Sequence, residues 1–193
     1  MSKQSFTDIV FQGKNYTPFQ KATAEAVAKN EVSNSTDLAF KLSAAPTSKS
    51  GYSFGGNQLD LGIKTNKKGK KIINRHAAAT FLDIMKNAVD KNGDKIISES
   101  FLNEIATVND KGVLVGGAIT KIGKGRTLTD EQLDTINKAF TSDYGREKIT
   151  QDYMHEITKR IDKVSKQIDK KIKSPEMRSM LKREQSLILL VDY

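Results

Sequence analysis

The sequence predicts a mostly helical α+β domain in which a small β-hairpin lies beside a helical lobe. Apolar residues recur at steps of three or four through most of the chain, which indicates amphipathic helices. Between residues 52 and 63 the apolar residues instead alternate around a glycine-rich turn. Because 193 residues suit a single core, we expect one domain over residues 1–193, with N-terminal helices and the hairpin in residues 1–73 and the helical lobe in residues 74–193.

The composition is that of a basic globular chain. Hydrophobic residues make up 37% and charged residues 28% of the chain, and helical periodicity argues against disorder despite this polarity. The formal net charge of +9 favours a polyanionic partner: nucleic acid, an anionic membrane or an anionic cell-wall glycan. Charge alone does not choose among the three.

Several kinds of site are excluded or not expected. The chain has no cysteine, which excludes disulfides, thiol catalysis and cysteine-ligated zinc, and its two isolated histidines do not suggest a metal site or a cofactor. We expect no membrane insertion, because no apolar run approaches about 18 residues. We also expect synthesis in the cytoplasm, since the first residues lack the pattern of a signal peptide.

Two helices are expected before the hairpin. Thr17 and Pro18 form the cap and first-turn pattern of a helix start. A second, short helix is expected from Ser35 or Thr36, with Leu38 and Leu42 facing inward. It should end near Ala45, because Pro46 disfavours a helical conformation in the residue before it.

The part of the chain after the hairpin is predicted to be mainly helical. Residues 64–71 form a basic loop, and helices follow from Asn74, from Ser98 and from Thr129, the last with a capping box. Residues 90–94 resemble the start of a calcium loop but lack its later ligands, so a solvated turn is expected. Residues 112–125 fit either a buried helix or a strand.

A long helix is predicted over about residues 149–172, after a break near Gly145, and Ser174-Pro175 should begin the last helix. Acidic residues are interleaved with the lysines of the long helix, which is typical of a solvated helix face. Together with the lack of a nucleic-acid-binding motif, this pattern predicts no specific nucleic-acid partner.

The stretch KSGYSFGGNQLDLG, residues 49–62, has the chemistry of a sugar-binding hairpin. Glycines let a ligand approach the backbone closely, and Tyr52 could offer a face to a pyranose ring. Gln58 and Asp60 are two residues apart on a strand and should point the same way. The alternative is a structural hairpin in which Tyr52 and Phe54 pack into the core and Asp60 bonds to the turn.

A helix, a short polar loop and a hairpin reading G-Y-S-F-G-G-x-Q-x-D, followed by a helical remainder, resemble the lysozyme superfamily of peptidoglycan hydrolases. That superfamily includes phage lysozymes, lytic transglycosylases and secreted antibacterial effectors. The resemblance implies a lysozyme-like fold and a glutamic acid at the end of the helix before the hairpin, which protonates the glycosidic oxygen. A second polar group, often an aspartate on the hairpin, would stabilise the developing charge or position water.

Carried onto this chain, the resemblance makes Asp60 the second carboxylate and places Tyr52, Ser53 and Gln58 at the substrate. The acid should stand just before residues 47–51, where the sequence has alanine and no carboxylate. Ala45, or else Ala44, is the position where the acid is expected. Either the glutamate has been replaced, or the chain is a natural glycan binder without the chemistry.

The expected function is therefore that of a muramidase acting on bacterial peptidoglycan, as an antibacterial effector or lysin in the periplasm or cell wall of a target bacterium. We expect a substrate cleft between the hairpin and the helical lobe. An immunity or inhibitor protein that plugs this cleft is the expected partner of such a toxin. The alternative is a non-catalytic glycan-binding or protein-assembly module whose hairpin is structural.

Overall fold

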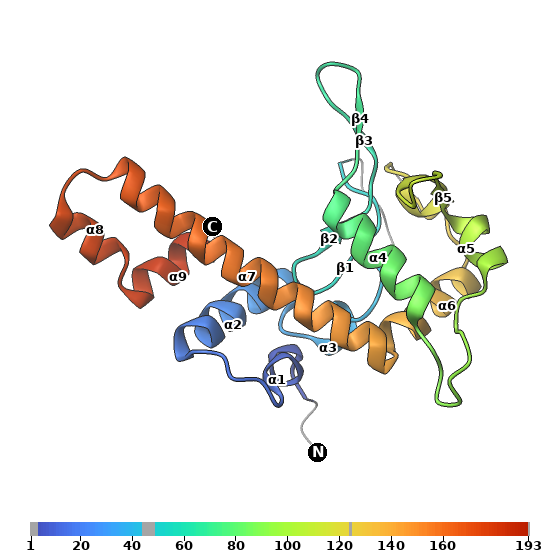
Figure 1. Ribbon diagram of the computed structural model, residues 1–193, viewed down its shortest axis with the longest axis horizontal. Coiled ribbons are helices and arrows are strands. Elements are labelled where there is room, and N and C mark those ends of the chain that lie inside the picture. Colours follow the sequence, from blue (N-terminus) through green and yellow to red (C-terminus); the bar gives the residue numbers. More distant parts are fainter. Residues whose placement is uncertain (1–3, 44–48, 124, 193) are drawn as a thin grey trace.

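The computed structural model describes residues 4–43, 49–123 and 125–192, and it is mostly helical with three small antiparallel strand pairs. Helix α7, Asp143–Lys171, is the longest helix of the described chain and runs along much of the molecule (Figure 1). Helices α1, Phe6–Phe11, and α2, Pro18–Val32, pack against it, as do the helices of residues 75–87, 130–141, 175–181 and 184–192. The mostly α class predicted from the sequence is thus found in the structure.

The hairpin predicted from the sequence is present and short. Strand β1, Ser53–Phe54, pairs with β2, Leu59–Asp60, so that Ser53 faces Asp60 and Phe54 faces Leu59. The predicted basic loop contains a second hairpin, β3, Lys64–Thr65, with β4, Lys71–Ile72. This second hairpin projects from the body of the molecule (Figure 1).

The segment before the first hairpin differs from the prediction. Helix α3, Thr36–Ala39, is only one turn long and does not reach residue 45. The chain turns away because Leu42 N–H donates to Asn137 Oδ1 (2.8 Å) and Ser43 N–H donates to the carbonyl of Ser53 (2.7 Å). Leu38, expected to face inward, is 54% exposed, whereas Leu42 is buried as expected.

The middle of the chain forms a small lobe of helices and a third strand pair. Helix α4, Arg75–Asn87, begins at the predicted Asn74 cap, and α5, Glu99–Ile105, begins at the Ser98 cap. The segment 112–125, left open between helix and strand, contains strand β6, Leu114–Gly116, and then one turn of 3₁₀ helix, η1, Ala118–Thr120. Strand β6 pairs with β5, Thr107–Val108, which precedes this segment.

The last part of the chain is helical, with two differences from the prediction. Helix α6, Asp130–Thr141, has the predicted capping box, and the single expected last helix is in fact α8, Pro175–Leu181, and α9, Glu184–Asp192. Gly145, expected as a break, lies inside the first turn of α7. A side chain at Gly145 would lie 2.1 Å from the carbonyl oxygen of Ala139, so glycine permits the tight α6–α7 corner.

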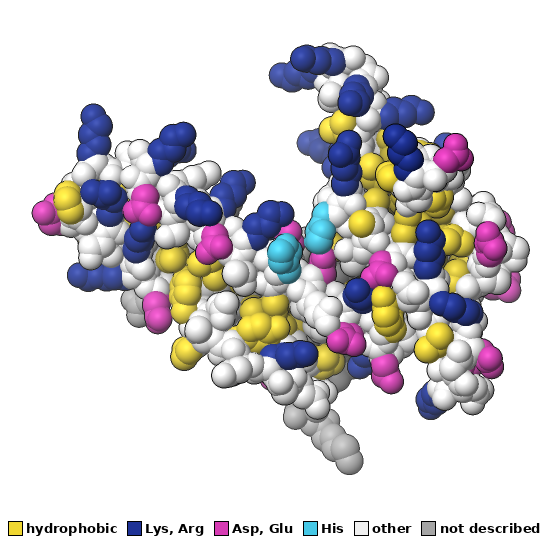
Figure 2. Space-filling model, viewed as in Figure 1, with side chains coloured by type: hydrophobic (Ala, Val, Ile, Leu, Met, Phe, Trp, Pro, Cys, Tyr) yellow, Lys and Arg dark blue, Asp and Glu magenta, His cyan; other side chains and the backbone are white. Residues whose placement is uncertain are grey.

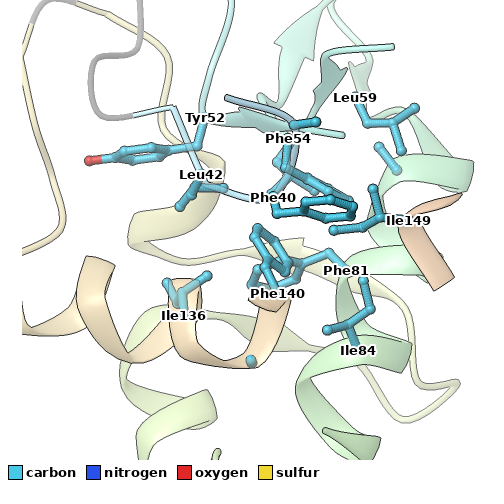
Figure 3. Close-up of a cluster of buried hydrophobic side chains, with 14 of the residues drawn as sticks. Phe40, Leu42, Tyr52, Phe54, Leu59, Phe81, Ile84, Ile136, Phe140 and Ile149 are labelled. Carbon is cyan, nitrogen blue, oxygen red and sulfur yellow. The ribbon is translucent and has the colours of Figure 1, made fainter. Parts of the chain in front are cut away.

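The core gathers where the first hairpin meets the helices (Figure 3). The Phe54 ring stacks on Phe140 of α6, with centroids 4.8 Å apart, and lies 6.4 Å from Phe81 of α4. One face of the hairpin is therefore part of the core, and its opposite face carries the polar residues predicted to form a site. No helix in the described ranges has both the length and the apolar character needed to cross a membrane.

Candidate functional site on the first hairpin

Asp60 holds the two ends of the first hairpin together. Its Oδ1 accepts hydrogen bonds from the N–H groups of Gly51 (2.9 Å) and Gly62 (2.8 Å), and its Oδ2 pairs with Lys64 Nζ (2.6 Å). Burial raises the pKa of Asp60, but the Lys64 ammonium and the two N–H groups outweigh this effect and hold it below its usual value. Asp60 is therefore an ionised group that is committed to the backbone of the hairpin.

Gly51 and Gly62 lie against each other at the base of the hairpin, where no other residue type would fit. A Cβ added to Gly51 would lie 2.6 Å from the Cα of Gly62, and a Cβ added to Gly62 would lie 2.6 Å from the nitrogen of Gly51. The strands approach this closely only because both residues lack a side chain. The hydrogen bonds to Asp60 require that approach.

A row of polar groups follows the open face of the hairpin. Ser53 Oγ donates to Gln58 Oε1 (2.9 Å), and Ser53 N–H donates to Ser43 Oγ (2.8 Å). Gln58 Nε2 donates in turn to the carbonyl of Gly55 (3.2 Å), and Gln58 has a left-handed backbone with φ of 48°. Ser53 faces Asp60 across the strands, whereas Gln58 lies in the turn rather than on a strand as predicted and joins this polar group through its hydrogen bond with Ser53.

The role predicted for Tyr52 is wrong. Tyr52 is fully buried, so neither face of its ring can meet a sugar. Its hydroxyl oxygen accepts hydrogen bonds from the N–H groups of Thr127 (2.9 Å) and Leu128 (3.1 Å), which join the hairpin to the start of α6. Tyrosine at this position serves packing and satisfies two backbone donors, as in the structural alternative considered for this hairpin.

The position expected for the general acid lies outside the described residues. Ala45 and Ala44 fall in the segment 44–48, and the last described residue before it is Ser43. Ser43 is hydrogen-bonded to Ser53 through its N–H, which donates to the Ser53 carbonyl, and through its side-chain oxygen, which accepts from the Ser53 N–H. Residue 45 is therefore two positions along the chain from a residue that is fixed to the polar face of the hairpin.

A second polar cluster, which the sequence analysis did not find, joins α4 to α7. His76 Nε2 lies 2.5 Å from Asp152 Oδ1 and 3.8 Å from Glu156 Oε1, and the rings of His76 and His155 have centroids 6.3 Å apart. The His76–Asp152 contact is an ion pair when the imidazole ring is protonated. Thr80 Oγ1 adds a hydrogen bond to Asp152 (3.2 Å).

Burial makes Asp152 unusual among the carboxylates of this cluster. Desolvation raises the pKa of Asp152, and neighbouring Glu156 adds to this effect, while His76 and Thr80 partly oppose it. Both histidines and Asp152 line an open pocket of about 440 Å³, together with Asp83, Lys148 and Gln151. Among the described residues no group of three histidines or acids is arranged to hold a metal ion. The contacts of Asp152 with His76 and Thr80 link α7 to α4.

Comparison of the chain with models of known protein families, with curated proteins and with solved structures gave no match.

Proposed function

We propose that this chain is a lysozyme-like protein that binds the glycan strands of bacterial peptidoglycan along the polar face of its first hairpin. The observation that carries the proposal is that the Ser43 N–H and Oγ are both hydrogen-bonded to the backbone of Ser53. These bonds fix Ser43, two residues before Ala45, against the same strand that carries the Ser53–Gln58 pair. A substrate on that face would meet hydroxyl, amide and backbone groups suited to sugar hydroxyls.

In this proposal the chemistry is muramidase cleavage of the glycan backbone, and the residue in the acid position decides its rate. A general acid contributes about 10²- to 10⁴-fold to such a reaction, and alanine has no proton to donate. The chain with alanine at positions 44 and 45 would thus bind peptidoglycan and cleave it slowly. An inhibitor protein that covers the hairpin face is the partner that this function implies for a toxin.

A non-catalytic glycan-binding module is the second candidate. The observation that favours it is the state of Asp60, whose two oxygens are already bound by Gly51, Gly62 and Lys64. A carboxylate so committed would have to release those partners before it could stabilise charge on a sugar. The two candidates share the binding face and differ in turnover.

Binding is tested by co-sedimentation of the chain with purified peptidoglycan from which other wall polymers have been removed. We expect Ser53→Ala and Gln58→Asn to lower retention several-fold, because each breaks the pair on the binding face; asparagine keeps an amide and tolerates a left-handed backbone. Asn87→Ala, on the exposed end of α4, is the control. Equal retention of all variants, or no retention of the unaltered chain, would contradict the proposal.

A further inference from the structure

Four of the six lysines of α7 follow one face of the helix. They occur at steps of four, three and four residues, which is the spacing of neighbours on one side of a helix. We call this set the lysine stripe: Lys159, Lys163, Lys166 and Lys170. The stripe extends over about 16 Å at 1.5 Å per residue, and with His155 it lines an open groove of about 580 Å³.

The acids interleaved with the stripe leave most of its charge in place. Glu156 pairs with Lys159 (3.0 Å) at one end, and Asp169, which does not line the groove, pairs with Lys182 just after α8 (2.6 Å). Asp162 is the single acid that lines the groove. Within the described part of the chain, no ion pair involves Lys163, Lys166 or Lys170, and all three are exposed.

A second group of lysines lies on the other side of a notch in the surface. The projecting β3–β4 hairpin carries five exposed lysines, which we call the lysine finger: Lys64, Lys67, Lys68, Lys70 and Lys71. Figure 2 shows basic side chains on the finger and along α7, with both histidines on the surface between them. The lysine stripe and the lysine finger thus lie on the two sides of this notch.

The groove has the chemistry to bind phosphate charges rather than bases. Its lining consists of lysines, Asp162, Thr158, Gln167 and the imidazole of His155, with no Phe, Tyr or Trp. Proteins that hold single-stranded nucleic acid combine a positive groove with aromatic side chains on which the bases stack. Charge without such a platform fits a flexible polyanion that has no bases.

We propose that the notch between the lysine stripe and the lysine finger binds a linear polyol-phosphate polymer of the kind attached to bacterial cell walls. This inference depends on the proposed function for its setting, because the polymer would hold the protein beside the glycan that the first hairpin binds. Spaced lysines on two walls can follow successive phosphates of one flexible strand. Binding of this kind releases counterions and weakens as salt concentration rises.

The test compares retention of the full chain on two preparations of the same cell wall, one carrying polyol-phosphate polymer and one chemically stripped of it. Purified poly(glycerol phosphate) serves as the soluble probe for affinity and for its dependence on salt. Three triple variants to glutamine carry the same net charge: Lys163, Lys166 and Lys170 in the stripe; Lys67, Lys68 and Lys70 in the finger; and, as control, Lys29, Lys91 and Lys111 on other surfaces.

We expect the stripped wall to retain the unaltered chain at least ten-fold less well at low salt. The stripe and finger variants should each lower the salt slope of probe binding by about 1 for each lysine that contacts a phosphate, while the control variant leaves it unchanged. An equal decrease in the salt slope of probe binding in all three variants would show that binding depends only on net charge. This result would overturn the inference. Tighter binding of single-stranded DNA than of the probe at equal salt would also overturn it.

Failure of this inference is distinguishable from failure of the proposed function. Retention on the stripped wall depends on the first hairpin and tests the glycan proposal alone. The difference between the two walls tests the notch alone. Equal retention of the chain on the two wall preparations would be consistent with the glycan proposal and would contradict the proposal that the notch binds the polymer.

Discussion

At the scale of single residues, Asp60 and Tyr52 show how the first hairpin is held in place. Asp60 binds two backbone N–H groups and Lys64, and Tyr52 accepts two backbone N–H groups from the start of α6. Both side chains accept hydrogen bonds from backbone N–H groups that do not pair with a neighbouring strand. Leaving such an N–H group unpaired in a protein interior lowers the free energy of unfolding. The stability of the hairpin should therefore depend strongly on these two side chains.

Asp60→Asn tests the first of these roles. We expect a loss of about 1.5–3 kcal/mol in the free energy of unfolding at pH 7, the range for hydrogen bonds to a charged group, with glycan binding per folded molecule unchanged. Because folding lowers the pKa of Asp60, its contribution is present above the unfolded value of about 3.9 and is lost as pH falls through the lower folded value. Urea unfolding from pH 6 to pH 3 should show the two proteins converging, and a constant difference would contradict this account.

Tyr52→Phe isolates the hydroxyl, since the ring remains. The N–H groups of Thr127 and Leu128 lose their acceptor, and we expect a cost of about 1–3 kcal/mol in unfolding free energy for buried groups left unpaired. Peptidoglycan retention of the folded variant should match that of the unaltered chain. A stable variant that no longer binds glycan would instead restore Tyr52 to the binding face.

At the scale of elements, local signals predicted where helices begin, and distant contacts decided where they end. The Thr17, Ser98 and Thr129 caps all start helices as their sequence patterns indicate. The early end of α3 could not be predicted, because it depends on Asn137, 95 residues away from Leu42. Likewise, no local pattern links His76 with Asp152, whereas the lysine stripe could have been recognised from its spacing on a helix.

The α6–α7 corner offers a test at this scale. Gly145→Ala would place a methyl group 2.1 Å from the carbonyl oxygen of Ala139, a distance that the backbone must relieve by moving. We expect a loss of more than about 2 kcal/mol in unfolding free energy, beyond the usual effect of a surface substitution. Gln151→Ala, on an exposed position of α7, is the control and should stay within about 0.5 kcal/mol. A stable Gly145→Ala protein would show that the corner is less tightly packed than described.

At the scale of the whole molecule, the hairpin and the basic notch define two surfaces with separate chemistry. The glycine-rich hairpin offers hydroxyl, amide and backbone groups, whereas the lysine stripe and lysine finger offer positive charge (Figure 2). The sequence predicted a polar side to the hairpin and the basic charge, but Tyr52 proved to be a core residue whose hydroxyl accepts from the N–H groups of Thr127 and Leu128, a distant pairing that no local pattern shows. The place where a catalytic acid is expected stays a prediction.

The central proposal is that residue 45, two positions along the chain from Ser43 and its hydrogen bonds to Ser53, is the position of the catalytic acid. It is tested most directly by incubating the unaltered chain and Ala45→Glu with purified peptidoglycan and measuring released muropeptide fragments by mass spectrometry, with Leu38→Glu as a matched control that adds a carboxylate to an exposed position nearby. We expect Ala45→Glu to release glycan fragments about 10²- to 10⁴-fold faster than the unaltered chain, and the control to match the unaltered chain. Rapid cleavage by the unaltered chain, or no gain in Ala45→Glu while binding is retained, would contradict the claim.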